Sequence, residues 1–127
     1  MKRVIYSLYI DVPAKEHFGD SKNRHDSIDK ANVTINAFKS HYDKLIKTKI
    51  KYAEHCKADF LMFEYDEQYK TFEKNFLKDY PVFTGYEIIN FYKIHLLYEL
   101  SKKYDEILYL DFDVIPFTNE SFFNALM

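Results

Sequence analysis

The chain alternates between short apolar runs and segments in which apolar residues recur every three or four positions. The apolar runs cover residues 3–10, 59–66 and 106–115, and the periodic segments cover 33–56 and 84–103. Short β-branched and aromatic runs are typical of buried strands, whereas the three-four spacing is typical of amphipathic helices. A strand–helix–strand–helix–strand order favours a mainly parallel sheet with helices on its faces. We therefore expect an α/β fold built as a single domain over residues 1–127.

Composition narrows the class of protein. The chain has 18 basic and 20 acidic residues and a formal net charge of −2, which gives no electrostatic reason to expect nucleic acid or an anionic membrane as a partner. No apolar run approaches the roughly 20 residues that cross a bilayer. The N-terminal run lacks a small-residue cleavage site, so we expect a first strand and a cytoplasmic protein. The single cysteine, Cys56, excludes an internal disulfide, and two glycines exclude glycine-rich phosphate loops.

Several local features refine this plan. Residues 11–32 are polar, and a connection of this length is either functional or a mobile excursion. Lys49 interrupts the apolar stripe of the first helix, whose other lysines form a solvated face. Thr84 and Glu87 have the spacing of a capping box, which predicts a helix start. Residues 67–81 fit a short helix or an irregular connection, and a last short helix is expected through Phe122, Phe123 and Leu126.

Asp111 and Asp113 follow the last apolar run and stand two residues apart. In an extended strand both carboxylates leave one face, while Phe112 points the other way. Two carboxylates this close repel each other, so either a cation keeps both ionised or one takes up a proton. Oxygen-only ligands suit Mg²⁺ or Mn²⁺, and the open part of the shell suits a diphosphate. In the alternative interpretation Asp113 begins a turn and Asp111 caps nearby backbone.

The segment from Lys93 to Pro116 contains the run YDEILYLDFDVIP and resembles the donor-binding segment of GT-A glycosyltransferases. It is most similar to the glycogenin and galactosyltransferase-like group, whose consensus is close to K…YD-ilylDaDvlp. Residues 35–60 resemble the first helix and second strand of that group, so the likeness covers most of the chain. The resemblance implies a Rossmann-like GT-A fold. It also implies a metal-dependent glycosyltransferase that binds a nucleotide-sugar donor, with a UDP-sugar favoured, through Mn²⁺ or Mg²⁺.

The same resemblance assigns a role to each candidate site residue. Asp113 would coordinate the cation, and Asp111 would reach the ribose hydroxyls and the metal shell. Lys93 matches a basic residue that contacts the donor, with a solvated helix lysine as the alternative. Asp66 would accept a hydrogen bond from a base N–H or serve as a turn aspartate. The other donor-binding candidates are Phe112 and, near the end of the first strand where core positions are the alternative, Ser7, Leu8 and Tyr9.

The sequence departs from that family after the motif. Family members continue well past it, and their later half supplies the acceptor site and usually a further metal ligand, often a histidine. Here 14 residues follow Asp113 and all five histidines precede it; of these, His95 is expected to be a half-buried helix residue. We therefore expect the usual acceptor-binding half to be missing, as in a minimal enzyme, a subunit completed by another chain, or a truncated form. The glycan or protein acceptor and the catalytic residues are unidentified.

Other functions compete with glycosyl transfer. A donor-binding half without an acceptor site would hydrolyse the nucleotide-sugar slowly. The stronger rival is a non-catalytic nucleotide-binding or assembly module derived from a glycosyltransferase. Haloacid-dehalogenase-like phosphatases also carry Asp-x-Asp after an apolar strand, but near the N-terminus and before Gly-Thr-like residues, whereas Val114, Ile115 and Pro116 follow here. The short C-terminal part and an aromatic content of 19% favour pairing of two chains as a homodimer.

Overall fold

The computed structural model describes residues 1–10, 41–116, 118 and 120–125. Its centre is a three-stranded parallel sheet of order β2-β1-β3, formed by β1 (Arg3–Tyr9), β2 (Asp59–Glu64) and β3 (Glu106–Tyr109). The predicted α/β class and the parallel sheet are confirmed. The arrangement is compatible with a Rossmann-like fold, and three strands are too few to identify the GT-A fold.

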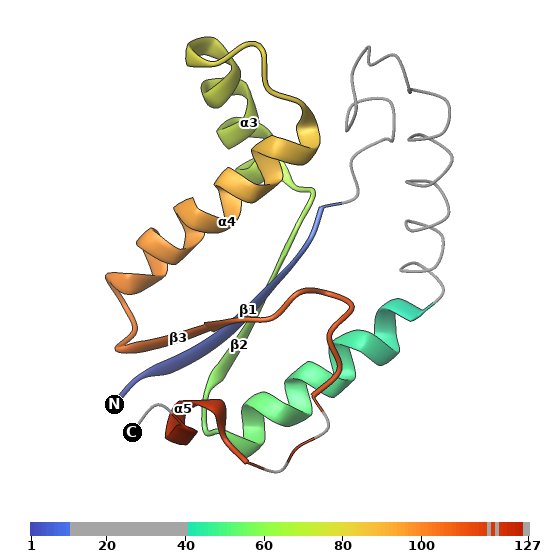
Figure 1. Cartoon of the computed structure of the whole chain (residues 1–127), viewed down its shortest axis with the longest axis vertical. Coiled ribbons are helices and arrows are strands. Elements are labelled where there is room, and N and C mark those ends of the chain that lie inside the picture. Colours follow the sequence, from blue (N-terminus) through green and yellow to red (C-terminus); the bar gives the residue numbers. More distant parts are fainter. Residues whose placement is uncertain (11–40, 117, 119, 126–127) are drawn as a thin grey trace.

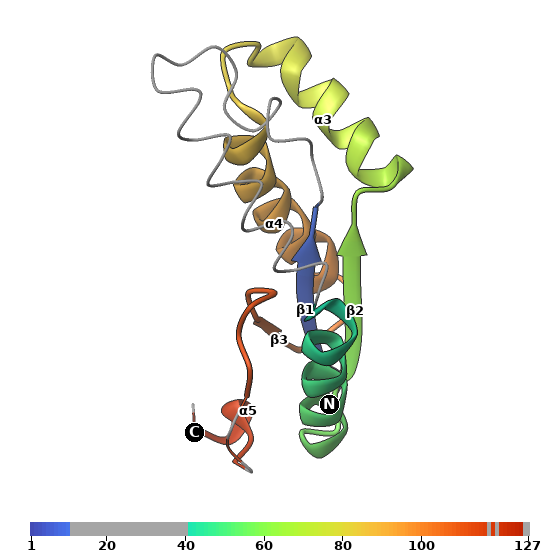
Figure 2. The same cartoon turned by 90° about the vertical axis from the view of Figure 1, so that its right-hand side faces the viewer.

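Helices cover both faces of the sheet. Figure 1 shows the helix over 41–55 on one side of the strands and α3 (Glu67–Asp79) and α4 (Gly85–Ser101) on the other. Figure 2, turned by 90°, shows α5 (Phe122–Ala125) as a short turn beside the 41–55 helix. The two crossovers that leave and enter the sheet therefore run over opposite faces, which is the doubly wound arrangement.

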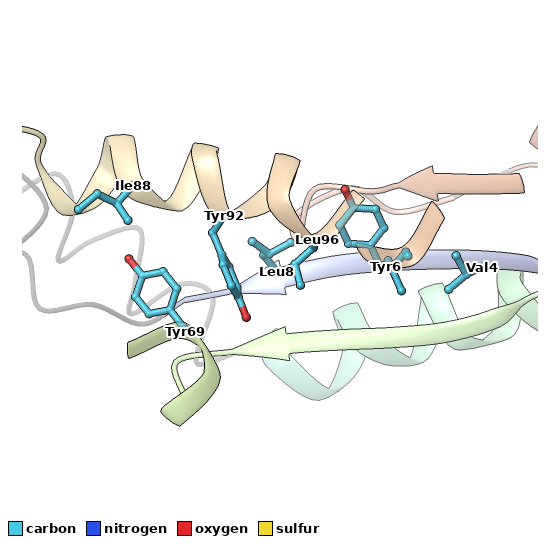
Figure 3. Close-up of a cluster of buried hydrophobic side chains, with 8 residues drawn as sticks. Val4, Tyr6, Leu8, Tyr69, Ile88, Tyr92 and Leu96 are labelled. Atoms are coloured by element: carbon cyan, nitrogen blue, oxygen red, sulfur yellow. The ribbon is translucent and has the colours of Figure 1, made fainter. Parts of the chain in front are cut away.

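Alternation along β1 divides the core in two. On one face Val4, Tyr6 and Leu8 meet the buried stripe of α4, and Figure 3 shows Tyr92 and Leu96 of that stripe extending from α4 toward β1. On the other face the core cluster contains Ile5, Tyr52, Ala53, Cys56 and Phe123. Because side chains alternate between faces of a strand, a central strand with both faces covered is expected to be almost continuously apolar; residues 4–8 of β1 are all buried, and Ser7 is the polar residue among them.

The helix starts follow local signals. Thr84 Oγ1 accepts a hydrogen bond from the Glu87 N–H, and the Glu87 carboxylate accepts one from the Thr84 N–H. This reciprocal pair is the predicted capping box. The segment 67–81 contains a regular helix, α3, whose N-cap is Asp66. The described part of the first helix, 41–55, is confirmed, and its exposed lysines 44, 47 and 51 form the expected solvated face.

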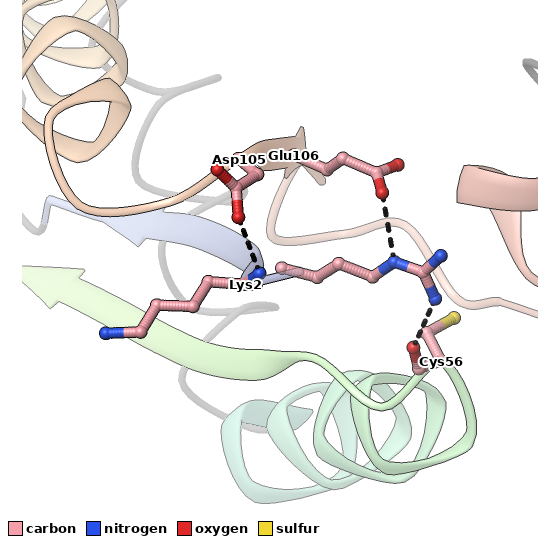
Figure 4. Close-up of polar contacts among 5 residues, drawn as sticks. Lys2, Cys56, Asp105 and Glu106 are labelled. Carbon is pink, nitrogen blue, oxygen red and sulfur yellow. Dashed lines mark hydrogen bonds and ion pairs between the residues drawn. The ribbon is translucent and has the colours of Figure 1, made fainter.

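Polar contacts fix the amino ends of the strands (Figure 4). Arg3 forms an ion pair with Glu106 at 3.2 Å and donates from Nη1 to the Cys56 carbonyl at 3.3 Å. The Lys2 N–H donates to Asp105 Oδ2 at 2.8 Å. These bonds join β1, β3 and the end of the 41–55 helix, so they fix how β1 and β3 are aligned along the sheet.

Two predictions need correction or restriction. The strand expected over 106–115 is wrong beyond Tyr109, because its ladder to β1 ends where Tyr6 pairs with Tyr109. The segments 11–32 and 33–40, with the expected lid or excursion and the start of the first helix, lie outside the described residues. No helix in the described part of the chain has the length and apolarity that a membrane span requires.

Candidate functional site

The carboxyl ends of β1 and β3 lie side by side, where a doubly wound sheet offers its binding crevice. The Leu110 N–H donates to the Tyr6 carbonyl at 3.0 Å, which continues the contact between the strands by one residue. The chain then turns, and the Val114 N–H donates to the Asp111 carbonyl at 3.0 Å. The motif is therefore a turn at the edge of the sheet, and we refer to residues 111–114 as the carboxylate turn.

The carboxylate turn exposes its two acids and buries the residue between them. Asp111 and Asp113 are exposed, and Phe112 is buried. The expectation that both acids share one strand face is wrong in its geometry, because the backbone is no longer extended at these positions. The part of the alternative interpretation that places a turn here is confirmed. The prediction that Phe112 points away from the two acids is also confirmed, because Phe112 is buried and they are exposed.

Lys93, from α4, reaches the first acid of the turn. Its Nζ lies 3.8 Å from Asp111 Oδ1 and 4.4 Å from the centroid of the Tyr109 ring. The Tyr6 hydroxyl donates to the Lys93 carbonyl at 3.0 Å, and the Tyr6 and Tyr109 rings are 5.1 Å apart. The two tyrosines thus hold the lysine from both its backbone and its side chain, so its ammonium is directed toward Asp111.

Tyr109 is a member of this group that the sequence did not single out. Burial raises the pKa of its hydroxyl far above the ordinary value, and the negative charge of Asp111 and a hydrogen bond to that carboxylate raise the pKa further. The hydroxyl therefore remains neutral and is a hydrogen-bond donor to the Asp111 carboxylate.

Lys49 approaches the same turn from the opposite face of the sheet. Its side chain is 0% exposed, and Nζ donates to the carbonyls of Phe112 and Leu45. The ammonium also lies 5.3 Å from the centroid of the Phe112 ring. Burial lowers the pKa of Lys49, while the nearby charge of Asp113 raises it. A buried cation thus anchors the backbone between the two acids and adds positive potential beside the second one.

The three candidates at the end of β1 have different surroundings. The Tyr9 ring packs against the Phe112 ring in a tilted arrangement, with centroids 4.8 Å apart. Ser7 is 0% exposed, and its Oγ has no hydrogen-bond partner among the described residues. Leu8 is buried in the core under α4. Tyr9 therefore contacts the carboxylate turn through its side chain, and the core alternative describes Leu8.

Asp66 lies at the end of β2, on the other side of β1 from the carboxylate turn. Its Oδ1 accepts from the Tyr69 N–H at 3.0 Å and caps α3. Capping satisfies one of the N–H groups that a helix start leaves without a partner. The turn-aspartate alternative therefore accounts for its position, and the structure does not bring it into the group formed by Lys93, Asp111 and Asp113.

Elsewhere on the molecule, an open pocket of about 480 Å³ lies between α3 and α4 and is lined by Phe72 and His95 among others. His95 is half-buried, and its ring lies 5.0 Å from that of Phe72, as expected for a helix residue. Across the described residues, no group of three or more His, Cys, Asp or Glu side chains gathers that could hold a metal ion. The carboxylate turn thus offers two acidic ligands.

Comparison of the chain with protein-family models, with curated proteins and with solved structures finds no match.

Proposed function

We propose that the chain binds a nucleotide-sugar donor, with a UDP-sugar favoured, and acts as the donor-binding part of a metal-dependent glycosyltransferase of the GT-A type. The observation that supports this proposal is the carboxylate turn itself. Two exposed acids stand just beyond the carboxyl end of β3, beside β1, and a lysine forms an ion pair with the first of them. A crevice at this edge is where ligands of doubly wound sheets bind.

The residues fit a hard divalent cation as part of its shell. Asp111 and Asp113 offer carboxylate oxygens, the ligand type that Mg²⁺ and Mn²⁺ prefer. Both are exposed, so diphosphate oxygens and water have access to the remaining positions. When bound, the cation would act as a Lewis acid that offsets the charge on the departing nucleoside diphosphate.

Lys93 suits the diphosphate of the donor. Its ammonium is paired with Asp111 at 3.8 Å, lies over the Tyr109 ring and is half-exposed. If Asp111 held a cation, the charge of Lys93 would be available to a phosphate oxygen of the donor. Charge-assisted contacts of this kind are among the strongest hydrogen bonds in proteins.

Binding of Mn²⁺ and UDP, measured by calorimetry, tests the proposal. Wild-type protein should bind UDP only when Mn²⁺ is present, and Asp113→Ala should abolish that binding while the far-ultraviolet circular dichroism spectrum is retained. Asp79→Ala is the matched control, because Asp79 is an exposed aspartate at the end of α3. Wild-type affinity in Asp113→Ala, or no binding by the wild-type chain, would refute the proposal.

Lys93→Ala separates the diphosphate contact from the base contact. It should weaken UDP binding more than uridine binding, whereas Lys103→Ala, an exposed lysine beyond α4, should change neither. An equal loss for UDP and uridine contradicts the assigned role. Incubation with UDP-sugars then distinguishes the enzyme from a binding module: release of UDP supports transfer or hydrolysis, and binding without turnover supports the module.

A further inference from the structure

The outward face of α4 is apolar, although the opposite face of the same helix is already buried against the sheet. Five large side chains on it are exposed: Tyr86 at 58%, Phe91 at 42%, Ile94 at 61%, Leu97 at 44% and Tyr98 at 62%. At 3.6 residues per turn they lie within an arc of about 140°. We call this arc the outer stripe. A helix that is apolar all round is normally covered on every side.

The outer stripe carries almost no charge. The acidic residue within its arc is Glu87, and its carboxylate is engaged in the capping box with Thr84. The other polar side chains in the arc, Asn90 and Ser101, are neutral and donate to carbonyls of their own helix. Burial of this surface therefore leaves no charged side chain without a partner, and an unpaired buried charge is the usual obstacle to covering a helix face.

From these features we infer that a second copy of the chain covers the outer stripe, with the two α4 helices packed antiparallel about a two-fold axis at Ile94. An isologous contact of this type uses the same patch twice, so the patch must be complementary to itself. A register centred on Ile94 meets this requirement, because it places Phe91 of one copy against Leu97 of the other.

The charges at the ends of the helix favour the antiparallel orientation. Glu87 lies in the first turn, and Lys102 caps the opposite end. Two-fold symmetry at Ile94 brings Lys102 of one copy to Tyr86 of the other, next to Glu87. Lys102 is paired with Glu99 of its own helix at 3.4 Å and lies 4.6 Å from the centroid of the Tyr98 ring, so its ammonium is placed at the end of the outer stripe. A parallel pair would instead bring like charges and like helix ends together.

The size of the outer stripe also fits a pair of chains. If a fully exposed side chain of this size offers about 200 Å², the exposed fractions correspond to roughly 500 Å² of surface in each copy. Two copies then bury roughly 1,000 Å² from these residues alone, which is the lower limit for a specific interface. We expect a dimer that dissociates on dilution.

Pairing through the outer stripe leaves the carboxylate turn accessible. Lys93 is adjacent to Ile94 in sequence and therefore lies about 100° around the helix from it, where it contacts Asp111. Dimerisation and nucleotide binding are thus separate properties of α4, and failure of one does not imply failure of the other.

Sedimentation velocity over a range of protein concentrations tests the pairing. The wild-type chain should shift from monomer to dimer as concentration rises, and Ile94→Lys should raise the dimer dissociation constant by at least about tenfold, because it places a charge at the centre of the contact. Ile50→Lys is the matched control: Ile50 is exposed on the 41–55 helix, on the other side of the sheet. A monomer at every concentration, or an unchanged dimer in Ile94→Lys, would overturn the inference.

Cross-linking tests the register. Helices in contact have axes about 8–10 Å apart, so two Ile94→Cys residues on the axis lie within reach of a symmetric disulfide. Tyr98→Cys residues would stand about 12 Å apart along the helices, beyond the roughly 7 Å limit for Cα atoms. Mild oxidation should therefore cross-link Ile94→Cys and not Tyr98→Cys; the reverse result contradicts the register at Ile94.

Discussion

Replacement of Lys49 by methionine tests how the buried ammonium under the carboxylate turn is stabilised. Methionine keeps a stem of similar length and removes the charge and its donors. The main loss is the hydrogen bond to the Phe112 carbonyl. The Leu45 carbonyl loses less, because it still accepts from Thr48 Oγ1 at 2.8 Å.

Two opposing free energies set the size of the effect. An acceptor left without its donor costs about 1–3 kcal/mol. Removal of a desolvated charge returns a comparable amount, since burial of an ion without a close counter-ion is unfavourable by several kcal/mol. We expect Lys49→Met to change the free energy of unfolding by less than about 2 kcal/mol. Lys49→Ala should be about 2 kcal/mol less stable than Lys49→Met, because it also removes packed stem atoms.

The pH dependence of stability tests independently whether burial of the Lys49 ammonium is unfavourable. Burial lowers the pKa of Lys49 from its ordinary value of 10.5, so between the lowered pKa and 10.5 the unfolded chain binds more protons than the folded chain. Stability of the wild type rises with pH in that window, whereas Lys49→Met lacks this contribution. The difference in stability between the two proteins should therefore move in favour of the wild type as pH increases toward 10.

Urea denaturation followed by far-ultraviolet circular dichroism suits the measurement, because the chain has no tryptophan. The two proteins are compared at pH 7 and at pH 9.5, and tyrosine titration cancels in the difference since both contain the same tyrosines. Equal stability of Lys49→Met and Lys49→Ala would show that the stem is not packed. A difference that moves in favour of Lys49→Met as pH rises would refute the buried-ammonium reasoning.

Two further substitutions probe the face of the sheet under α4. The Tyr92 hydroxyl is buried without a hydrogen-bond partner among the described residues, and burial raises its pKa to about 12; Tyr92→Phe should be as stable as the wild type or more so at pH 7. Between pH 10 and 12 the free energy of unfolding of Tyr92→Phe should fall by about 2 kcal/mol less than that of the wild type. Equal alkaline unfolding of both proteins would contradict this. Thr84→Ala removes the capping box of α4 and should lower the free energy of unfolding by about 1 kcal/mol; a urea midpoint equal to that of the wild type would argue against the cap.

Local signals in the sequence were sufficient for most of the fold. The capping box at Thr84 and Glu87 and the stripe of Ile88, Tyr92 and Leu96 depend on residues within one helix, so the pattern contains the needed information. The central strand was equally clear, because a run buried on both faces is almost continuously apolar. These elements determine a parallel sheet through general rules of chain connection, and the structure confirms it.

The end of β3 was not predictable in the same way. The apolar run continues to Ile115, and periodicity alone gives no reason for the chain to turn earlier. Pairing stops at Tyr109 although β1 continues to Tyr9. The chain instead turns between Asp111 and Val114, and the Phe112 carbonyl in this turn accepts a hydrogen bond from Lys49, 63 residues earlier. Strand propensity describes what a segment permits, whereas its length also depends on contacts with distant parts of the chain.

The site shows the same division between local and distant information. The sequence predicts that Asp111, Asp113 and Lys93 belong together, and Lys49 was visible only as an interruption of an apolar stripe. Its acceptor, the Phe112 carbonyl, is 63 residues away, and no pattern within the helix indicates it. A charged residue on a buried stripe is therefore better interpreted as a sign that a hydrogen-bond acceptor lies elsewhere in the chain than as an irregularity in the pattern.

Lys49 also changes the physical problem that the two acids pose. From the sequence alone, adjacent carboxylates call for a cation or a shared proton. In the structure a lysine from each helix layer faces them, Lys93 at Asp111 and Lys49 near Asp113. Two positive charges therefore stand beside two negative ones. If a cation binds there, as the proposed function requires, it would add charge to a balanced site, and an anionic diphosphate would restore the balance. The proposed function therefore predicts joint binding of cation and diphosphate in preference to binding of the cation alone.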